Sequence, residues 1–91
     1  MAQKNLSLTF SGYWREPKRD SVPAASGVYC VYTATHNEAQ NTVTLHKLVY
    51  IGEAGDVRQR LANHERRDDW ARHLGRGQVL CFSFAPVAAA D

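Results

Sequence analysis

The chain has 91 residues, of which 44% are hydrophobic and 22% charged, and its 11 Lys or Arg exceed its 9 Asp or Glu by a net charge of +2. This composition is typical of one small globular domain and excludes a disordered chain. No apolar run approaches the roughly eighteen residues of a membrane span, and residues 1–20 lack the pattern of a secretory leader. We therefore expect a soluble cytoplasmic protein without a membrane partner.

The two cysteines predict no redox or metal chemistry. Cys30 and Cys81 are 51 residues apart, and each lies within an apolar run that is typical of a strand. This arrangement favours two buried, reduced thiols over a disulfide framework or a Cys-x-x-Cys site.

The first residues predict a strand or an extended arm. Leu6, Leu8 and Phe10 alternate with polar residues, which is the pattern of a half-buried strand over residues 5–11. This segment leads into an aromatic pair, Tyr13 and Trp14. For a small domain, we expect these rings to pack on the sheet rather than to stack on a nucleic-acid base.

Residues 17–26 contain two prolines and several small residues, and they are expected to form a connector. The chain is therefore divided into an N-terminal strand or arm over residues 1–22 and a main domain over residues 23–91.

Two strands and a polar connection follow. Residues 27–33 predict a strand that is buried on both faces, residues 34–42 are polar and typical of turns, and residues 43–52 predict the returning strand. In an antiparallel pair, these strands would bring Tyr29 and Tyr50 near each other.

The best-defined helix is predicted for residues 56–66. Asp56 follows a glycine and suits an N-cap, and Val57 and Leu61 form an apolar i, i+4 pair on one helix face. The buried face of this helix would carry those two side chains.

A second, shorter helix and a third strand are predicted to complete the domain. Asp68 or Asp69 can cap the helix, and Trp70 and Leu74 would form its buried stripe. Alternating apolar residues then predict a strand over residues 78–85.

The order of four features identifies a resemblance. Gly27-Val28-Tyr29 and Tyr50-Ile51-Gly52 lie on the two predicted strands, Arg60 follows the second tripeptide by eight residues, and His64 lies four residues further on. Together they resemble the GIY-YIG nuclease superfamily over about residues 23–85. The resemblance implies an α+β fold with a small three-stranded antiparallel sheet flanked by helices, to which an N-terminal strand can be added.

The resemblance also implies an activity and a set of site residues. Members of this superfamily cleave DNA with one divalent metal ion, so Mg²⁺ or Mn²⁺ is the expected cofactor. The nucleic-acid partner is expected to be DNA rather than RNA, reached with help from a targeting domain or a partner protein. The implied site residues are Tyr29, Tyr50, Arg60, His64 and His73, with Gly27 and Gly52 permitting close approach of the backbone.

Individual roles follow from the chemistry of phosphodiester hydrolysis. The resemblance favours Tyr29 over Tyr50 as the general base, although an unperturbed phenol, with a pKa of about 10, is a poor base. Arg60 and His64 are neighbours on one helix face, so Arg60 can hold a phosphate oxygen while His64 orients the phosphate or moves a proton. His73 matches a position at which some members of the superfamily carry another histidine.

Arginines are concentrated after the second strand. Every cation between residues 56 and 76 is an arginine, whose planar fork matches phosphate oxygens, although a solvated helix face of mixed charge has the same composition. Three of these arginines are assigned to nucleic-acid binding: Arg58, Arg66 and Arg67.

One departure from the superfamily concerns the metal ligand. Members bind the ion through a glutamate on a helix after the third strand, and this chain ends at Asp91, where that helix would begin. Glu53 and Glu65 do not match the missing position, so no residue is assigned to the metal. The expected function is a metal-dependent endonuclease in a truncated domain, and the alternative is a catalytically inactive nucleic-acid-binding or interaction module on the same fold.

Overall fold

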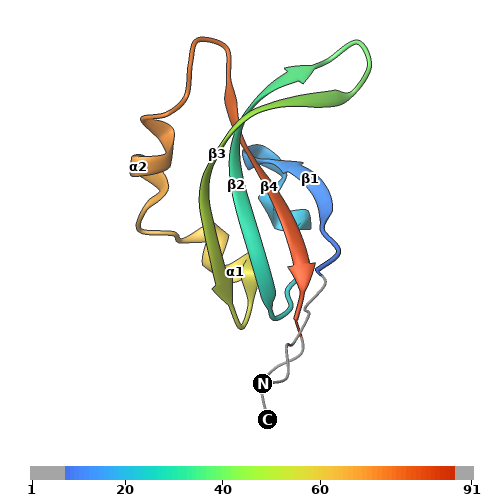
Figure 1. Cartoon of the computed structure of the whole chain (residues 1–91), viewed down its shortest axis with the longest axis vertical. Helices are drawn as coiled ribbons and strands as arrows, with labels where there is room; N and C mark the ends of the chain where they lie inside the picture. Colours follow the sequence, from blue (N-terminus) through green and yellow to red (C-terminus); the bar gives the residue numbers. More distant parts are fainter. Residues whose placement is uncertain (1–7, 88–91) are drawn as a thin grey trace, which may run out of the picture.

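The computed structural model describes residues 8–87, which form a small α+β domain around a four-stranded antiparallel sheet with strand order β1-β4-β2-β3 (Figure 1). The expected α+β class and antiparallel sheet are therefore confirmed, with the N-terminal strand as a fourth member. In chain order the elements are β1 (Ser11–Arg15), the 3-10 helix η1 (Glu16–Ser21), β2 (Gly27–Asn37), β3 (Thr42–Ala54), α1 (Val57–Ala62), α2 (Arg67–Ala71) and β4 (Val79–Pro86).

The N-terminal strand lies later in the chain than its hydrophobic alternation predicts. β1 pairs antiparallel with the edge of β4, from Ser11 opposite Phe84 to Arg15 opposite Cys81. Residues 8–10 have no regular secondary structure, and residues 5–7 lie outside the described residues. The position of β1 is set by hydrogen bonds to β4, a segment that is distant in sequence, and side-chain alternation carries no information about those bonds.

The β2–β3 hairpin is longer than predicted. Most of the polar stretch at residues 34–42 continues the two strands, and only the residues between Asn37 and Thr42 form the turn, with Asn41 at a φ of 52°. The Asn37 amide donates hydrogen bonds to the hydroxyls of Thr42 (3.2 Å) and Thr44 (3.1 Å) across the hairpin. Polar side chains therefore stabilise an exposed ladder here rather than a loop.

The predicted N-cap of α1 is confirmed, but the helix ends four residues early. The Asp56 carboxylate accepts a hydrogen bond from the Gln59 backbone N–H at 3.1 Å. The helix stops at Ala62, because the backbone of Asn63 is not helical. The side chain of the next residue, His64, accepts a hydrogen bond from a backbone N–H, as described below. The predicted N-cap of α2 is wrong, because the N-cap is Arg66 and not Asp68 or Asp69. Both aspartates lie in the first turn, where the positive end of the helix dipole stabilises their negative charges.

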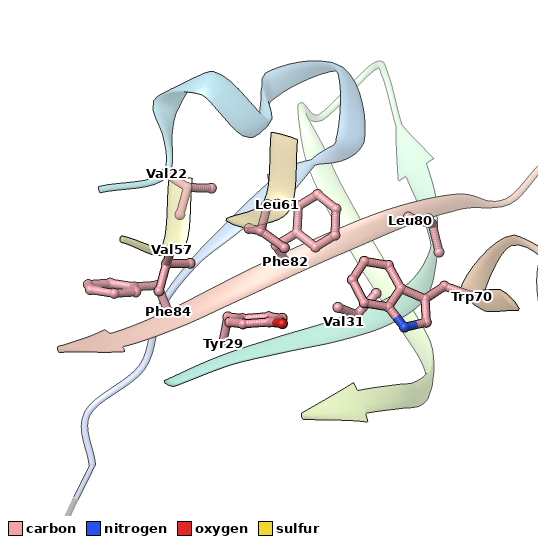
Figure 2. Packing of buried hydrophobic residues seen from close by; sticks show 9 residues of the cluster. All are labelled: Val22, Tyr29, Val31, Val57, Leu61, Trp70, Leu80, Phe82 and Phe84. Carbon is pink, nitrogen blue, oxygen red and sulfur yellow. The ribbon is translucent and has the colours of Figure 1, made fainter. Parts of the chain in front are cut away.

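The core lies on one face of the sheet, beneath α1 and η1 and against α2 (Figure 2). As predicted, the alternate residues of β4 point into it, and Trp70 and the apolar pair of α1 are buried. Leu74 lies beyond the end of α2 and is half-buried. Burial of such side chains stabilises the fold by about 1.5–3 kcal/mol each. The members of the core are Val22, Tyr29, Val31, Val57, Leu61, Trp70, Leu80, Phe82 and Phe84.

Both cysteines are buried free thiols, as the sequence predicts, and burial raises the pKa of Cys81 to about 11. A thiol with such a pKa is protonated and unreactive at neutral pH. Over residues 8–87 every helix is too short to cross a bilayer.

Candidate active site

A hydrogen bond between Tyr29 and His64 forms the centre of the candidate site. The Tyr29 hydroxyl lies 2.7 Å from Nε2 of His64, which joins β2 to the turn after α1. The second ring nitrogen, Nδ1, accepts a hydrogen bond from the backbone N–H of Arg66 at 3.1 Å. Because Nδ1 is an acceptor, the proton of the neutral ring resides on Nε2, and His64 donates to the Tyr29 oxygen.

Both side chains are buried, with exposed fractions of 1% for Tyr29 and 7% for His64. Three aromatic contacts hold the imidazole in place. Its ring centre lies 4.2 Å from that of Trp70, 5.5 Å from that of Tyr50 and 6.0 Å from that of Tyr29. This packing stops the imidazole from turning away from the phenol.

The expected proximity of the two motif tyrosines is found in the structure. The ring centres of Tyr29 and Tyr50 are 6.1 Å apart, and Gly52 pairs with Tyr29 across the hairpin. A Cβ atom at Gly52 would lie 2.6 Å from both Cζ and Oη of Tyr29 and 2.8 Å from Cε2 of Tyr50. A glycine is therefore required here for the phenol to reach His64.

The other motif glycine, Gly27, allows two strands of the sheet to pack closely. A Cβ atom at Gly27 would clash with the carbonyl oxygen of Ala85 and would lie 2.6 Å from the ring of Phe84, both on β4. Gly27 thus permits close packing of β2 against β4, two residues before Tyr29 on the same strand.

Arg60 supplies the positive charge of the site. Its side chain is 42% exposed, and its guanidinium lies 3.9 Å from the Glu65 carboxylate. Burial raises the pKa of Tyr29, and Tyr50 adds to this, whereas the hydrogen bonding and charge of Arg60 oppose it. Burial also lowers the pKa of His64, and the Arg60 charge lowers it further. The resting pair is therefore a protonated phenol and a neutral imidazole.

The remaining histidine of the predicted set has a different neighbour. Nδ1 of His73 lies 3.2 Å from Nζ of Lys47 on β3, and both side chains are exposed. Among the described residues, this ammonium is the hydrogen-bond partner of the His73 imidazole, and His73 is not among the hydrogen-bond or aromatic partners of Tyr29 and His64.

Two of the three arginines assigned to nucleic acid already have protein partners. Nε of Arg58 donates to the carbonyl oxygen of Val22 at 2.7 Å, which fastens α1 to the end of η1. Arg67 forms two hydrogen bonds to the Glu16 carboxylate, at 2.8 and 2.7 Å. The side chain of Arg66 is exposed, and its backbone N–H is the group that contacts His64.

Trp70 is the site residue that sequence reasoning missed. Its burial on α2 is predicted, but its contact with His64 depends on how the turn between the two helices brings α2 back over the sheet. The indole Nε1 is buried without a hydrogen-bond partner in the described structure. The only signal in the sequence is a large aromatic residue six positions after the motif histidine.

Two hollows lie near the buried pair, one lined by His64 and the other by Arg60, and Tyr29 lines neither of them. One, of about 440 Å³, lies between η1 and the turn that carries His64, and its lining mixes acidic and basic side chains. The other, of about 300 Å³, is lined by Arg60 together with Ala54 and Asp56. Asn63 contributes to both hollows, so it separates the side of His64 from the side of Arg60.

The described residues do not fit a metal site. Residues 8–87 contain no group of three or more His, Cys, Asp or Glu side chains arranged to hold an ion. Glu53 is exposed, and Glu65 lies beside Arg60. The expected lead into a ligand-bearing helix at residues 88–91 lies outside the described residues.

No protein-family model matches this chain, and neither the curated proteins nor the solved structures contain a detectable match. The geometry of the site is consequently the basis for any functional assignment.

Proposed function

We propose that this chain is a nuclease domain that hydrolyses phosphodiester bonds, preferably in DNA, as the GIY-YIG resemblance implies. The observation that carries the proposal is the buried hydrogen bond from His64 to Tyr29 with the charge of Arg60 beside it. The site thereby combines the phenol of Tyr29 from β2, the guanidinium of Arg60 from α1 and the imidazole of His64 from the turn after α1. This is a set able to move a proton and to stabilise an anionic transition state.

In the proposed reaction, Tyr29 acts as a phenolate. Once the phenol has lost its proton to solvent, the Nε2–H of His64 and the Arg60 guanidinium both stabilise the oxygen anion. The phenolate then accepts a proton from a water molecule as the water oxygen attacks phosphorus. The bond between phosphorus and the leaving oxygen breaks, and that oxygen takes up a proton from solvent and departs as the sugar hydroxyl. Because Nδ1 of His64 is occupied by the Arg66 N–H, His64 remains a neutral donor during this step.

Arg60 has a second task in the reaction. Its exposed guanidinium can bind a non-bridging phosphate oxygen, whose negative charge increases as the water attacks. The Glu65 carboxylate, at 3.9 Å, competes for the same guanidinium, so substrate would replace this weak surface contact.

The proposed cofactor is Mg²⁺ or Mn²⁺, which would neutralise charge on the leaving oxygen. Since the described residues do not supply its ligands, none of the steps above runs through the ion. The same observation favours a second candidate function, a nucleic-acid-binding or interaction module on this fold that does not cleave.

Plasmid nicking with Mg²⁺ or Mn²⁺ tests the proposal, with DNA affinity measured in parallel by fluorescence anisotropy. We expect Arg60→Ala to slow nicking by about 100-fold or more, the effect of losing a transition-state donor, while DNA affinity stays within about threefold. Arg72→Ala is the matched control because it removes an exposed arginine whose ion-pair partner is Asp69 rather than a residue of the candidate site. Equal rates for the two variants would refute the role of Arg60. Absence of nicking by the folded wild-type chain, together with DNA binding, would refute nuclease activity of this chain and favour the binding module.

A further inference from the structure

A third hollow, of about 620 Å³, opens between β1, η1 and the distal part of the β2–β3 hairpin. It shares no lining residue with the hollows beside His64 and Arg60. Its lining includes two cations and an imidazole, together with aromatic and small polar residues, but no carboxylate. We call it the Arg15 pocket, and its main side chains are Tyr13, Trp14, Arg15, Lys18, His36 and Asn41.

The cations of the Arg15 pocket lack counter-ions within the described part of the chain. Arg60, Arg67 and Arg72 each lie within 4 Å of a carboxylate, whereas neither Arg15 nor Lys18 forms an ion pair there. Two positive charges lining one hollow repel each other, and this arrangement is stabilised when an anion binds between them.

His36 provides an independent indication of a ligand. Its Nε2 atom is buried and has no hydrogen-bond partner in the described structure. A buried polar atom left unpaired costs about 1–3 kcal/mol, so most such atoms acquire a partner. With the proton on Nε2, His36 can donate to an oxygen in the same hollow that Arg15 and Lys18 line.

Aromatic surface lies next to these donors. Tyr13 is 52% exposed and is held edge-to-face against Tyr32, with ring centres 5.7 Å apart. The half-buried Trp14 also lines the hollow. An exposed aromatic ring in a hollow that is also lined by two cations and an imidazole suits a ligand that has both an anionic group and a planar ring.

We propose that the Arg15 pocket binds a nucleotide, with Arg15, Lys18 and His36 holding its phosphate and Tyr13 packing against its base. Phosphate is favoured over a carboxylate ligand because it offers several oxygens, enough for a guanidinium, an ammonium and an imidazole at once. The nucleotide can be free or part of a strand, since both present the same phosphate and ring. The site stands apart from the proposed nuclease activity and requires no cleavage.

The test is a titration of the ¹⁵N-labelled full chain, followed by NMR, with inorganic phosphate, dAMP and a short single-stranded oligonucleotide. We expect dAMP to shift amide signals of residues 12–15, 36 and 41–43. Arg15→Gln should weaken dAMP binding by at least about tenfold, as expected for a lost charge-assisted hydrogen bond. Arg72→Gln, which removes an equal charge elsewhere, should leave it unchanged. Tyr13→Ala should weaken binding of dAMP but not of phosphate.

Each outcome has a defined meaning. Arg15-dependent binding of dAMP supports a free nucleotide as the source, and Arg15-dependent binding of the oligonucleotide alone supports a strand. Equal losses for Arg15→Gln and Arg72→Gln would overturn the proposal, because they would show general attraction between charges. Equal affinities for phosphate and dAMP would overturn the role of Tyr13. Since binding is the measured quantity, failure of the nicking assay leaves this result intact, and the reverse is also true.

Discussion

The Tyr29–His64 pair and the Arg15 pocket differ in how their polar groups are satisfied. In the buried pair, both nitrogens of His64 have partners, and rings on three sides fix its orientation. In the Arg15 pocket, two cations lack counter-ions in the described structure and a buried nitrogen of His36 lacks a partner. The first region is organised before any ligand arrives, as proton transfer requires, whereas the second is completed by what it binds.

The largest expected effect is on the nicking rate, which should depend on the Tyr29–His64 pair. Burial and Tyr50 raise the pKa of Tyr29 above its usual 10.0. The phenolate fraction, and with it the nicking rate, should therefore rise about tenfold per pH unit from pH 7 to 9.5. Tyr29→Phe should lower the rate by about 100-fold or more and remove this dependence. Nicking measured across this pH range checks both statements, and a plateau below pH 8 would exclude Tyr29 as the base.

Added volume at the buried pair should destabilise the fold. Gly52→Ala places a methyl group 2.6 Å from the Tyr29 hydroxyl, and we expect it to destabilise the fold by about 1–3 kcal/mol. Gly55→Ala is the control, since no atom lies within 4 Å of its Cβ position, and it should change stability by no more than about 0.5 kcal/mol. Urea denaturation measures both. Similar losses for the two variants would show that the region is not tightly packed.

Protonation of His64 should destabilise the fold. Burial lowers the pKa of His64 below 6.5 in the folded state, so the unfolded chain takes up the proton more readily. The contribution of His64 to stability is thus complete above pH 6.5 and is lost as pH falls from 6.5 through the folded-state pKa. Urea midpoints measured between pH 7.5 and 5 should fall less steeply for His64→Gln than for the wild type.

A matched control for this pH dependence is His46→Gln, because His46 is exposed and bonded to the Thr35 hydroxyl. This variant should retain the wild-type fall in stability. Identical slopes for His64→Gln and the wild type would contradict the assignment of a buried neutral imidazole.

The smallest expected effect concerns the ion pair on the rim of the hollow next to His64. Glu16 and Arg67 form a bidentate pair that links η1 to α2, and the Arg67 hydrogen bond is the main cause of the lowered pKa of Glu16. Because the pair is partly exposed, a double-mutant cycle with Glu16→Gln and Arg67→Gln should give a coupling of about 0.2–1 kcal/mol. A coupling near zero would show that the pair is fully screened by solvent.

Parts of the fold and site could be predicted because short-range patterns determine them. The N-cap at Asp56, the antiparallel hairpin and the alternation of β4 each depend on neighbouring residues, and the hairpin register then brings Tyr29 near Tyr50. The extent of that hairpin could not be predicted, because the hydrogen bonds from Asn37 to threonines across the strands turn a polar sequence into a ladder.

The sequence by itself determined the residue types of the candidate active site and the strand that carries Tyr29. The predicted placement of Arg60 and His64 on one helix face is wrong, because α1 ends at Ala62 and His64 lies in the turn that follows. Only the tertiary structure decided that α1 stops before His64, that Trp70 packs on the imidazole, and that Arg15 and His36 line one pocket. These contacts join segments distant in the chain. Their energies arise from packing and hydrogen bonds between elements, which no local pattern of residues encodes.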